Sequence, residues 1–203
     1  RLESLIVRLN EFLNHPQIIG LSATISNPNF FNEWLSSLGN TSVLIKSDHR
    51  PVPLHYEIKI SQNKDSTIKA IVNKVLSEKG QVLVFTRTRR GAQQQASYLK
   101  TIVKKHLSER EAEHCKKIGK DLLEIKGGHR ELPKVFKCGV AFHHAGLLPK
   151  ERKFIENAYN SSTIKIICCT TTLSAGINTP ARVVILKDFK MYSAPEIRIK
   201  NFA

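Results

Sequence analysis

Polar and basic residues follow three apolar segments of this chain, at the points where those segments end. The set comprises Thr88, Arg89, Arg90, His143, His144, Gly146, Thr170 and Thr172. Hydroxyls, imidazoles, guanidinium groups and exposed backbone N–H groups all donate to phosphate oxygens, and Thr88 is placed to cap a helix whose N-terminus would itself favour an anion. We therefore predict that these residues hold a sugar–phosphate backbone by its position rather than by base identity.

An alternation of strands and helices would bring these residues to one edge of a sheet. An apolar run typical of a strand buried on both faces occupies residues 81–85, and three more apolar strands are predicted at 140–142, 164–168 and 183–186. Helical patterns lie around them, at residues 68–76, 89–106, about 107–126 and 149–159. This alternation predicts an α/β fold with a doubly wound parallel sheet, in which ligands bind at the carboxyl ends of the strands.

The first 47 residues have their own pattern. Apolar residues at helical spacing predict a helix up to Leu13, and Asn27-Pro28 predicts the start of a second helix that Gly39 ends. Short apolar runs predict strands at residues 18–21 and 43–45, and an alternating run predicts another at 54–60. Two prolines mark residues 48–53 as a linker, so the expected domains are 1–47 and 54–203.

The excess of positive charge lies in the second domain. The 203 residues carry 32 Lys+Arg against 17 Asp+Glu, a net charge of +15, whereas residues 1–47 are neutral. A basic excess in one segment favours a polyanionic partner, with nucleic acid first. The positive residues do not follow one amphipathic helix, which disfavours a protein of the membrane surface.

Several other classes of protein are disfavoured. No apolar run is long enough to span a membrane, and the N-terminus lacks the features of a signal peptide. Four cysteines do not make a disulfide framework in a chain of this size, so we expect a reducing cytoplasmic setting. The cysteines and histidines lack the paired spacing of a zinc site, and no nucleophile elbow is present, so we expect no metal site and no Ser-His-Asp hydrolase.

Four blocks of sequence resemble motifs of superfamily-2 helicases. Residues 21–24 (LSAT) resemble motif III, 83–90 (LVFTRTRR) motif IV, 141–147 (AFHHAGL) motif IVa and 170–182 (TTTLSAGINTPAR) motif V. Their order and spacing are similar to those of the superkiller-like DExH branch, especially the archaeal DNA-repair helicases related to the helicase domain of polymerase theta. The resemblance covers nearly the whole chain.

The resemblance implies a motor of two RecA-like domains that moves 3′ to 5′ along single-stranded nucleic acid using ATP. Residues 1–47 would be the C-terminal part of the first domain, and 54–203 most of the second. By position, Ser22, Ala23 and Thr24 would couple the ATP state to domain closure, and Gly176, Asn178 and Arg182 would lie toward the nucleotide. The eight residues named at the outset would include the contacts to the tracking strand. Many relatives carry Asp in place of Asn178, which weakens the ribose contact expected there.

The sequence lacks a phosphate-binding P-loop, a D-E-x-H box and a Q-x-x-G-R-x-G-R motif. We therefore expect ATP and Mg²⁺ to serve the full-length enzyme and this chain alone to bind neither and to hydrolyse no ATP. The expected function is a piece of a DNA helicase of repair or recombination, with single-stranded DNA favoured over RNA. An RNA helicase of the same branch and a non-enzymatic nucleic-acid-binding module remain alternatives. The strand-separating hairpin of the family would fall at or beyond the end of the chain, and no protein partner is indicated.

Overall fold

The computed structural model describes residues 2–22, 25–39, 41–47, 52–173, 180–188, 190–193 and 198–201, without the side chains of Thr172 and of the last two segments. The chain divides into two compact units, Arg1–Ile58 and Lys59–Ala203. No described helix is long and apolar enough to cross a lipid bilayer.

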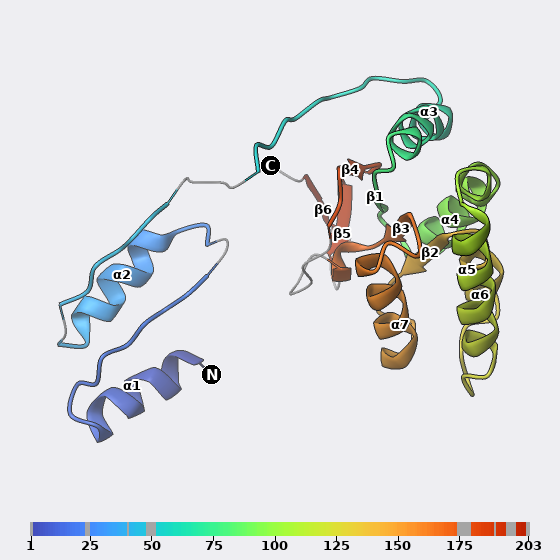
Figure 1. Cartoon of the computed structure of the whole chain (residues 1–203). Coiled ribbons are helices and arrows are strands. Elements are labelled where there is room, and N and C mark those ends of the chain that lie inside the picture. The colour runs from blue at the N-terminus through green and yellow to red at the C-terminus, as the bar shows by residue number, and fades with distance from the viewer. Residues whose placement is uncertain are drawn as a thin grey trace. The chain divides into compact units, whose positions relative to one another are not determined.

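The first unit contains two helices, α1 (Leu2–Phe12) and α2 (Pro28–Ser37), as the sequence predicted (Figure 1). Asn27 caps α2 by accepting a hydrogen bond from Phe30 N at 3.3 Å. Asn10 is the one buried residue of α1, and its side-chain amide donates to Leu38 O at 2.8 Å. A polar contact, rather than an apolar core, therefore links the ends of these two helices.

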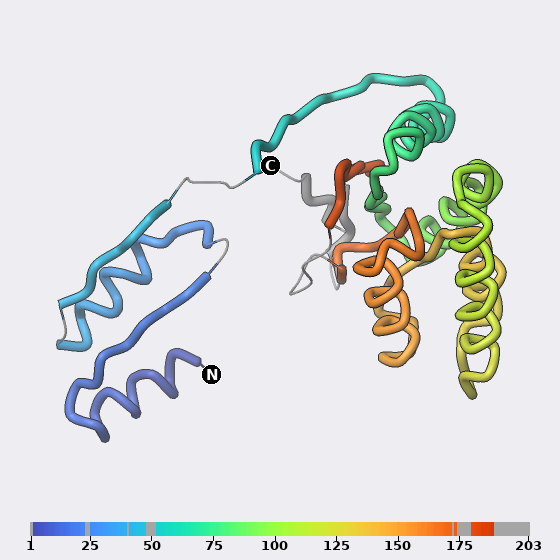
Figure 2. The backbone as a smooth tube through the Cα atoms, viewed as in Figure 1, coloured from blue at the N-terminus to red at the C-terminus, as the bar shows by residue number. Residues whose placement is uncertain are grey.

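The strands predicted at residues 18–21, 43–45 and 54–60 are absent, and this part of the prediction was wrong. The backbone there has no regular secondary structure, and Figure 2 traces residues 52–61 as an extended chain leading into the next helix. The apolar side chains are exposed as well, with Leu21 93% and Ile45 86% accessible. A strand needs a neighbour for its N–H and C=O groups, and the described part of this unit supplies none.

The second unit is built on a parallel sheet of four strands in the order β2-β3-β1-β4 (Figure 1). The strands are β1 (Val82–Phe85), β2 (Val140–His143), β3 (Ile166–Cys169) and β4 (Val183–Leu186). All four fall where the apolar runs predicted them, and the predicted α/β fold with a parallel sheet is confirmed. Buried side chains of β1, β2 and β3 form the centre of one hydrophobic core.

The helices of this unit are α3 (Lys64–Ser77), α4 (Arg89–Lys105), α5 (Glu109–Leu123), α6 (Leu132–Phe136) and α7 (Pro149–Asn160). Helix α4 packs on β2 and β3, α3 packs on α4, and α5 lies along α6. The sequence did not predict α6, which is only five residues long and has a proline in its first turn. Three helices, α4, α5 and α6, therefore connect β1 to β2, which lie on either side of β3 in the sheet.

Two further strands follow β4. They are β5 (Lys190–Ser193) and β6 (Arg198–Asn201), which pair antiparallel, with Tyr192 opposite Ile199. The strand-separating hairpin of the family was expected at or beyond the end of the chain, and this antiparallel pair lies close to that end.

Candidate nucleic-acid interface

The carboxyl ends of all four parallel strands lie in one row. The register aligns Phe85 of β1 with Cys169 of β3 and with Leu186 of β4, and it aligns His143 of β2 with the same Cys169. Backbone hydrogen bonds continue just past the row, since Thr86 N donates to Cys169 O at 2.8 Å and Thr170 N donates to His143 O at 3.1 Å. The predicted convergence of the segments after β1, β2 and β3 is therefore present.

The segment after β1 opens α4 at this edge. Thr88 caps the helix by accepting a hydrogen bond from Gly91 N at 2.9 Å, as the sequence predicted. Its hydroxyl proton remains available for an outside acceptor, because the bond from Gly91 uses only a lone pair. Arg89 and Arg90 occupy the first turn, and both are exposed. An exposed N-terminus of a helix with two arginines is suited to bind phosphate.

The turn after β2 lies against Arg89. A Cβ atom built on Gly146 would come within 3.2 Å of Arg89 Nη1 and 3.2 Å of His144 Nδ1. Gly146 N donates to His144 Nδ1 at 3.1 Å. Ala145 and Gly146 are exposed. The turn therefore presents backbone beside a guanidinium group, and a side chain at Gly146 would crowd both.

The two histidines are buried beneath this turn. His143 is 1% and His144 is 2% exposed. His143 Nε2 lies 3.2 Å from Glu156 Oε1, whereas its Nδ1 is buried without a partner. A neutral ring with its proton on Nε2 suits these surroundings, since that proton is donated to Glu156 and only an acceptor is left unused. Both imidazoles are therefore packed inside the protein under the turn, where His144 bonds Gly146 N, and they expose almost no surface to a ligand.

Burial makes both histidines harder to protonate. It is the main cause that lowers the pKa of His144, and the nearby His129, Arg89 and His143 act in the same direction. Burial also lowers the pKa of His143, against the opposing effect of Glu156. Both rings are therefore expected to be neutral in the folded chain at pH values where an unperturbed histidine already binds a proton.

This difference predicts that the chain loses stability in mild acid. Below the ordinary histidine pKa of 6.5, the unfolded chain binds more protons than the folded chain, so the free energy of unfolding falls as pH falls through that value toward the lowered pKa values. The slope is at most about 1.4 kcal/mol per pH unit for each ring. Urea unfolding midpoints measured at a series of pH values test this. His144→Asn, which keeps an acceptor for Gly146 N but cannot titrate, should flatten the profile, and an unchanged profile would contradict the assignment.

The segment after β3 completes the edge. Thr170 is half-buried and begins a 3-10 turn, Thr171–Leu173, in which Leu173 N donates to Thr170 O at 3.2 Å. Thr170 therefore lies at the same edge as Arg89 and Gly146. The side chain of Thr172 lies outside the described residues, as do Gly176 and Asn178 of the predicted nucleotide-facing set.

Arg182 lies elsewhere. It directly precedes β4, at the amino end of the sheet, where its guanidinium pairs with Glu78 Oε2 at 2.6 Å and its stem packs against Gly80. It is the one member of the nucleotide-facing set that the structure describes, and it does not join the residues at the carboxyl edge. Of the predicted ATP-coupling residues, Ser22 is exposed in the first unit, and Ala23 and Thr24 lie outside the described residues. The described residues therefore do not form a nucleotide site.

Three residues of this edge were not predicted from the sequence: Gln93, His129 and Glu151. The terminal amide of Gln93 lies 3.1 Å from His129 Nε2 and 3.0 Å from His144 Nε2. Glu151 is buried and accepts from His129 N at 2.6 Å and from Leu148 N at 2.9 Å. Only the position of Glu151 three residues after Leu148 carried a signal, because Glu at this place in a first turn can bond back to the residue before the helix.

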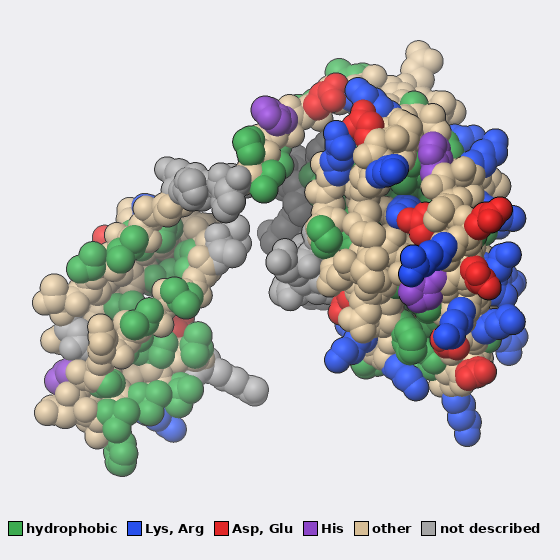
Figure 3. Space-filling model, viewed as in Figure 1, with side chains coloured by type: hydrophobic (Ala, Val, Ile, Leu, Met, Phe, Trp, Pro, Cys, Tyr) green, Lys and Arg blue, Asp and Glu red, His purple; other side chains and the backbone are tan. Residues whose placement is uncertain are grey.

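The surface of the second unit is rich in cations. Figure 3 shows Lys and Arg side chains gathered over the side where α5 and α6 lie, with Asp and Glu among them. Arg89 and Arg90, at the carboxyl edge, have no ion pair among the described residues. Unpaired cations beside exposed backbone N–H groups form a surface suited to an extended polyanion.

Residues 63–200 match the family model of the helicase conserved C-terminal domain. The chain is 36% identical to the ATP-dependent DNA helicase Hel308 of Caldivirga maquilingensis, over 94% of the chain and 27% of that protein. It is 38% identical to the protein of the same name from Pyrococcus horikoshii, over 91% of the chain and 26% of that protein. It is 35% identical to the protein of that name from Methanococcus vannielii, over 95% of the chain and 28% of that protein. The chain thus spans only about a quarter of the length of these relatives, and the resemblance to archaeal DNA helicases is confirmed.

Proposed function

This chain belongs to the helicase conserved C-terminal domain family, and from that premise we propose that it forms the strand-gripping half of an ATP-dependent DNA helicase. The observation that carries the proposal is the single row of strand ends, after which Arg89, Gly146 and Thr170 follow, with Arg89 Nη1 beside Gly146. Groups that contact phosphate and sugar, rather than base edges, suit a motor that must step along any sequence.

The proposal divides the predicted contacts into two kinds. Thr88, Arg89, Arg90, Gly146, Thr170 and Thr172 hold the strand directly. His143 and His144 are positioning residues, because they are buried and act on the strand through the turn that they support. This division differs from the expectation that the two imidazoles themselves touch the nucleic acid.

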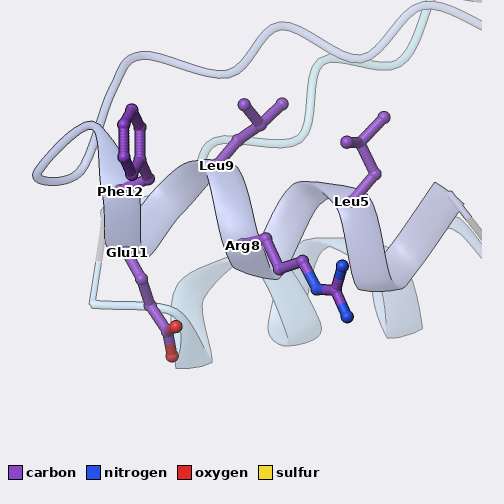
Figure 4. Close-up of a pocket in the computed structure, with 5 residues that line it drawn as sticks. All are labelled: Leu5, Arg8, Leu9, Glu11 and Phe12. Carbon is purple, nitrogen blue, oxygen red and sulfur yellow. The ribbon is translucent and has the colours of Figure 1, made fainter.

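Helix α1 of the first unit has an exposed apolar face. In Figure 4, Leu5, Leu9 and Phe12 project to one side of α1, whereas Arg8 and Glu11 project to the other. Phe12 is 84% exposed and Leu5 is 53% exposed, and Asn10 is the single buried residue of the helix. An amphipathic helix with its apolar face uncovered needs another surface to pack on. We propose that residues 1–47 are part of the first RecA-like domain and that 48–53 link it to the second.

The finer features of the helicase are part of the same proposal. We infer 3′ to 5′ movement on single-stranded DNA in repair or recombination, in a reducing cytoplasm that suits four free cysteines. ATP and Mg²⁺ belong to the full-length enzyme, where Ser22, Ala23 and Thr24 couple the nucleotide state to closure and Gly176 and Asn178 lie toward the nucleotide. Arg182, which pairs with Glu78 at the amino end of the sheet, is left out of that set. The β5–β6 pair occupies the place in the sequence expected for a strand-separating hairpin.

The proposal is tested by titrating the chain into labelled single-stranded DNA and into RNA of matched sequence, over a range of salt concentrations. We expect log K to fall linearly with log salt, with a slope of about −0.7 per phosphate neutralised, and DNA to bind more tightly than RNA. We also expect no ATP turnover by this chain, with or without the strand.

Three other results of these measurements would each contradict one part of the proposal. No binding, or binding that salt does not weaken, would contradict strand gripping by this edge. Equal binding of RNA would favour the RNA-helicase alternative, which the phosphate-directed contacts allow because they include no test for a 2′-hydroxyl. ATP turnover stimulated by single strands would contradict the assignment of hydrolysis to the full-length enzyme.

A further inference from the structure

The loop between α5 and α6, residues 124–131, reaches the same edge as the predicted motifs. Its His129 ring lies edge-on to Phe142 of β2, with centroids 5.0 Å apart, and 6.2 Å from the His144 ring. Phe142 and His144 are themselves stacked at 5.5 Å. A segment that the sequence marked only as a break at Gly127-Gly128 is therefore part of the wall of the candidate interface.

Gln93 ties this loop to the turn after β2. His144 Nδ1 accepts from Gly146 N, and His129 Nδ1 accepts from Glu131 N, so the N–H of each ring is placed on Nε2. Both Nε2–H groups then point at one terminal atom of Gln93, at 3.1 Å and 3.0 Å. Only the amide oxygen can accept from two donors, and we therefore assign the oxygen to that position.

Glu151 makes a second connection between the loop and the turn after β2. One of its carboxylate oxygens accepts from His129 N and the other accepts from Leu148 N, which lies just past the turn. A Cβ atom on Gly128 would stand 3.2 Å from Glu151 Oε1 and 3.0 Å from Ile125 O, so glycine allows this close approach. The loop is thus held by one side chain from α4 and one from α7.

The loop also carries two cations. Lys126 and Arg130 are exposed, and neither forms an ion pair among the described residues. Glu131, the acidic neighbour, is already paired with Lys134 at 2.7 Å. The loop reaches the turn of Gly146 through His129 and His144, so unpaired positive charge on it lengthens the path available to a chain of phosphates.

We propose that the α5–α6 loop is a further segment of the strand-binding edge, in which Gln93 positions the loop against the His144–Gly146 turn and Arg130 and Lys126 contact the phosphates. The inference rests on the proposed function, since it extends the same interface. Gln93 is a positioning residue, because it acts through the two histidines.

The test measures binding of the full 203-residue chain to labelled single-stranded DNA by anisotropy. Arg130→Ala and Lys126→Ala should each weaken binding several-fold at low salt and make the salt slope shallower by about 0.7. Lys104→Ala is the matched control, since Lys104 is an exposed cation in the last turn of α4, at the other end of that helix. It should leave the slope unchanged.

Gln93→Leu tests the positioning role without a change of charge. It should weaken binding in the wild-type background but add nothing once Lys126→Ala and Arg130→Ala are both present, because Gln93 acts on the strand through those two contacts. Additive losses for Gln93→Leu and the combined Lys126→Ala and Arg130→Ala changes would overturn the role of Gln93.

Arg89→Ala separates failure of the inference from failure of the proposed function. If Arg89→Ala weakens binding and neither Arg130→Ala nor Lys126→Ala does, the loop is not part of the edge and the inference alone is overturned. If none of the three changes affects binding, or if the wild-type chain does not bind, the proposed function fails and the inference fails with it. If Gln93→Leu does not fold, Lys126→Ala and Arg130→Ala still test whether the loop contacts the strand.

Discussion

Glu151→Ala is expected to lower the free energy of unfolding by about 3 kcal/mol, because two backbone N–H groups lose their acceptor and each such loss costs about 1–3 kcal/mol. The carboxylate is 2% exposed and accepts from His129 N at 2.6 Å and from Leu148 N at 2.9 Å. Water cannot easily replace an acceptor in so buried a place. Urea unfolding, followed by circular dichroism, measures the change.

The control is Glu124→Ala, which removes an exposed carboxylate from the end of α5. A surface change of this kind should alter stability by no more than about 0.5 kcal/mol. Glu151→Gln should fall between the two, since its amide keeps one acceptor but turns an N–H donor toward a backbone N–H. If Glu151→Ala costs no more than Glu124→Ala, the carboxylate does not hold the loop and turn together.

The predictable part of the fold depends on strands that have a neighbour in the same sheet. The apolar runs that became β1 to β4 each pair with at least one other strand of the unit, and those of β1, β2 and β3 are also buried, whereas Val184 and Leu186 of β4 are exposed. The runs at residues 18–21 and 43–45 look the same in sequence, yet their side chains are exposed and no strand forms. An apolar run shows that a segment can be buried, but it does not show that a partner strand is present.

The candidate site could be predicted only where it follows the backbone. The position of Arg89 and the cap at Thr88 follow from the end of a strand and the start of a helix, and both are observed. Gln93 could not be predicted, because its partners His129 and His144 lie 36 and 51 residues away. The burial of the two histidines was missed for the same reason, since packing from distant helices decides whether an imidazole reaches solvent.

Replacing Arg89 and Arg90 together by alanine is expected to weaken binding to single-stranded DNA about a hundredfold at low salt, on the estimate that each lost charge-assisted phosphate contact costs about 1.4 kcal/mol. The salt slope should become shallower by about 1.4, which corresponds to two phosphates. Both side chains are exposed at the edge where the strand ends meet, and Arg89 Nη1 lies beside Gly146. Fluorescence anisotropy across a salt series gives the affinity and the slope together.

The matched control changes the same charge at the other end of the same helix, with Lys104→Ala and Lys105→Ala combined. Cations favour the C-terminus of a helix and are unfavourable at its N-terminus, so the two pairs should differ in stability as well as in binding. Loss of the arginine pair should leave the chain as stable or slightly more stable, whereas loss of the lysine pair should cost a few tenths of a kcal/mol. Equal losses of affinity in both double variants would show that net charge alone attracts the strand. A loss of affinity confined to the arginine pair would show that these two side chains bind the strand. Strand binding would then explain why two arginines occupy a helix N-terminus, where the helix dipole disfavours positive charge.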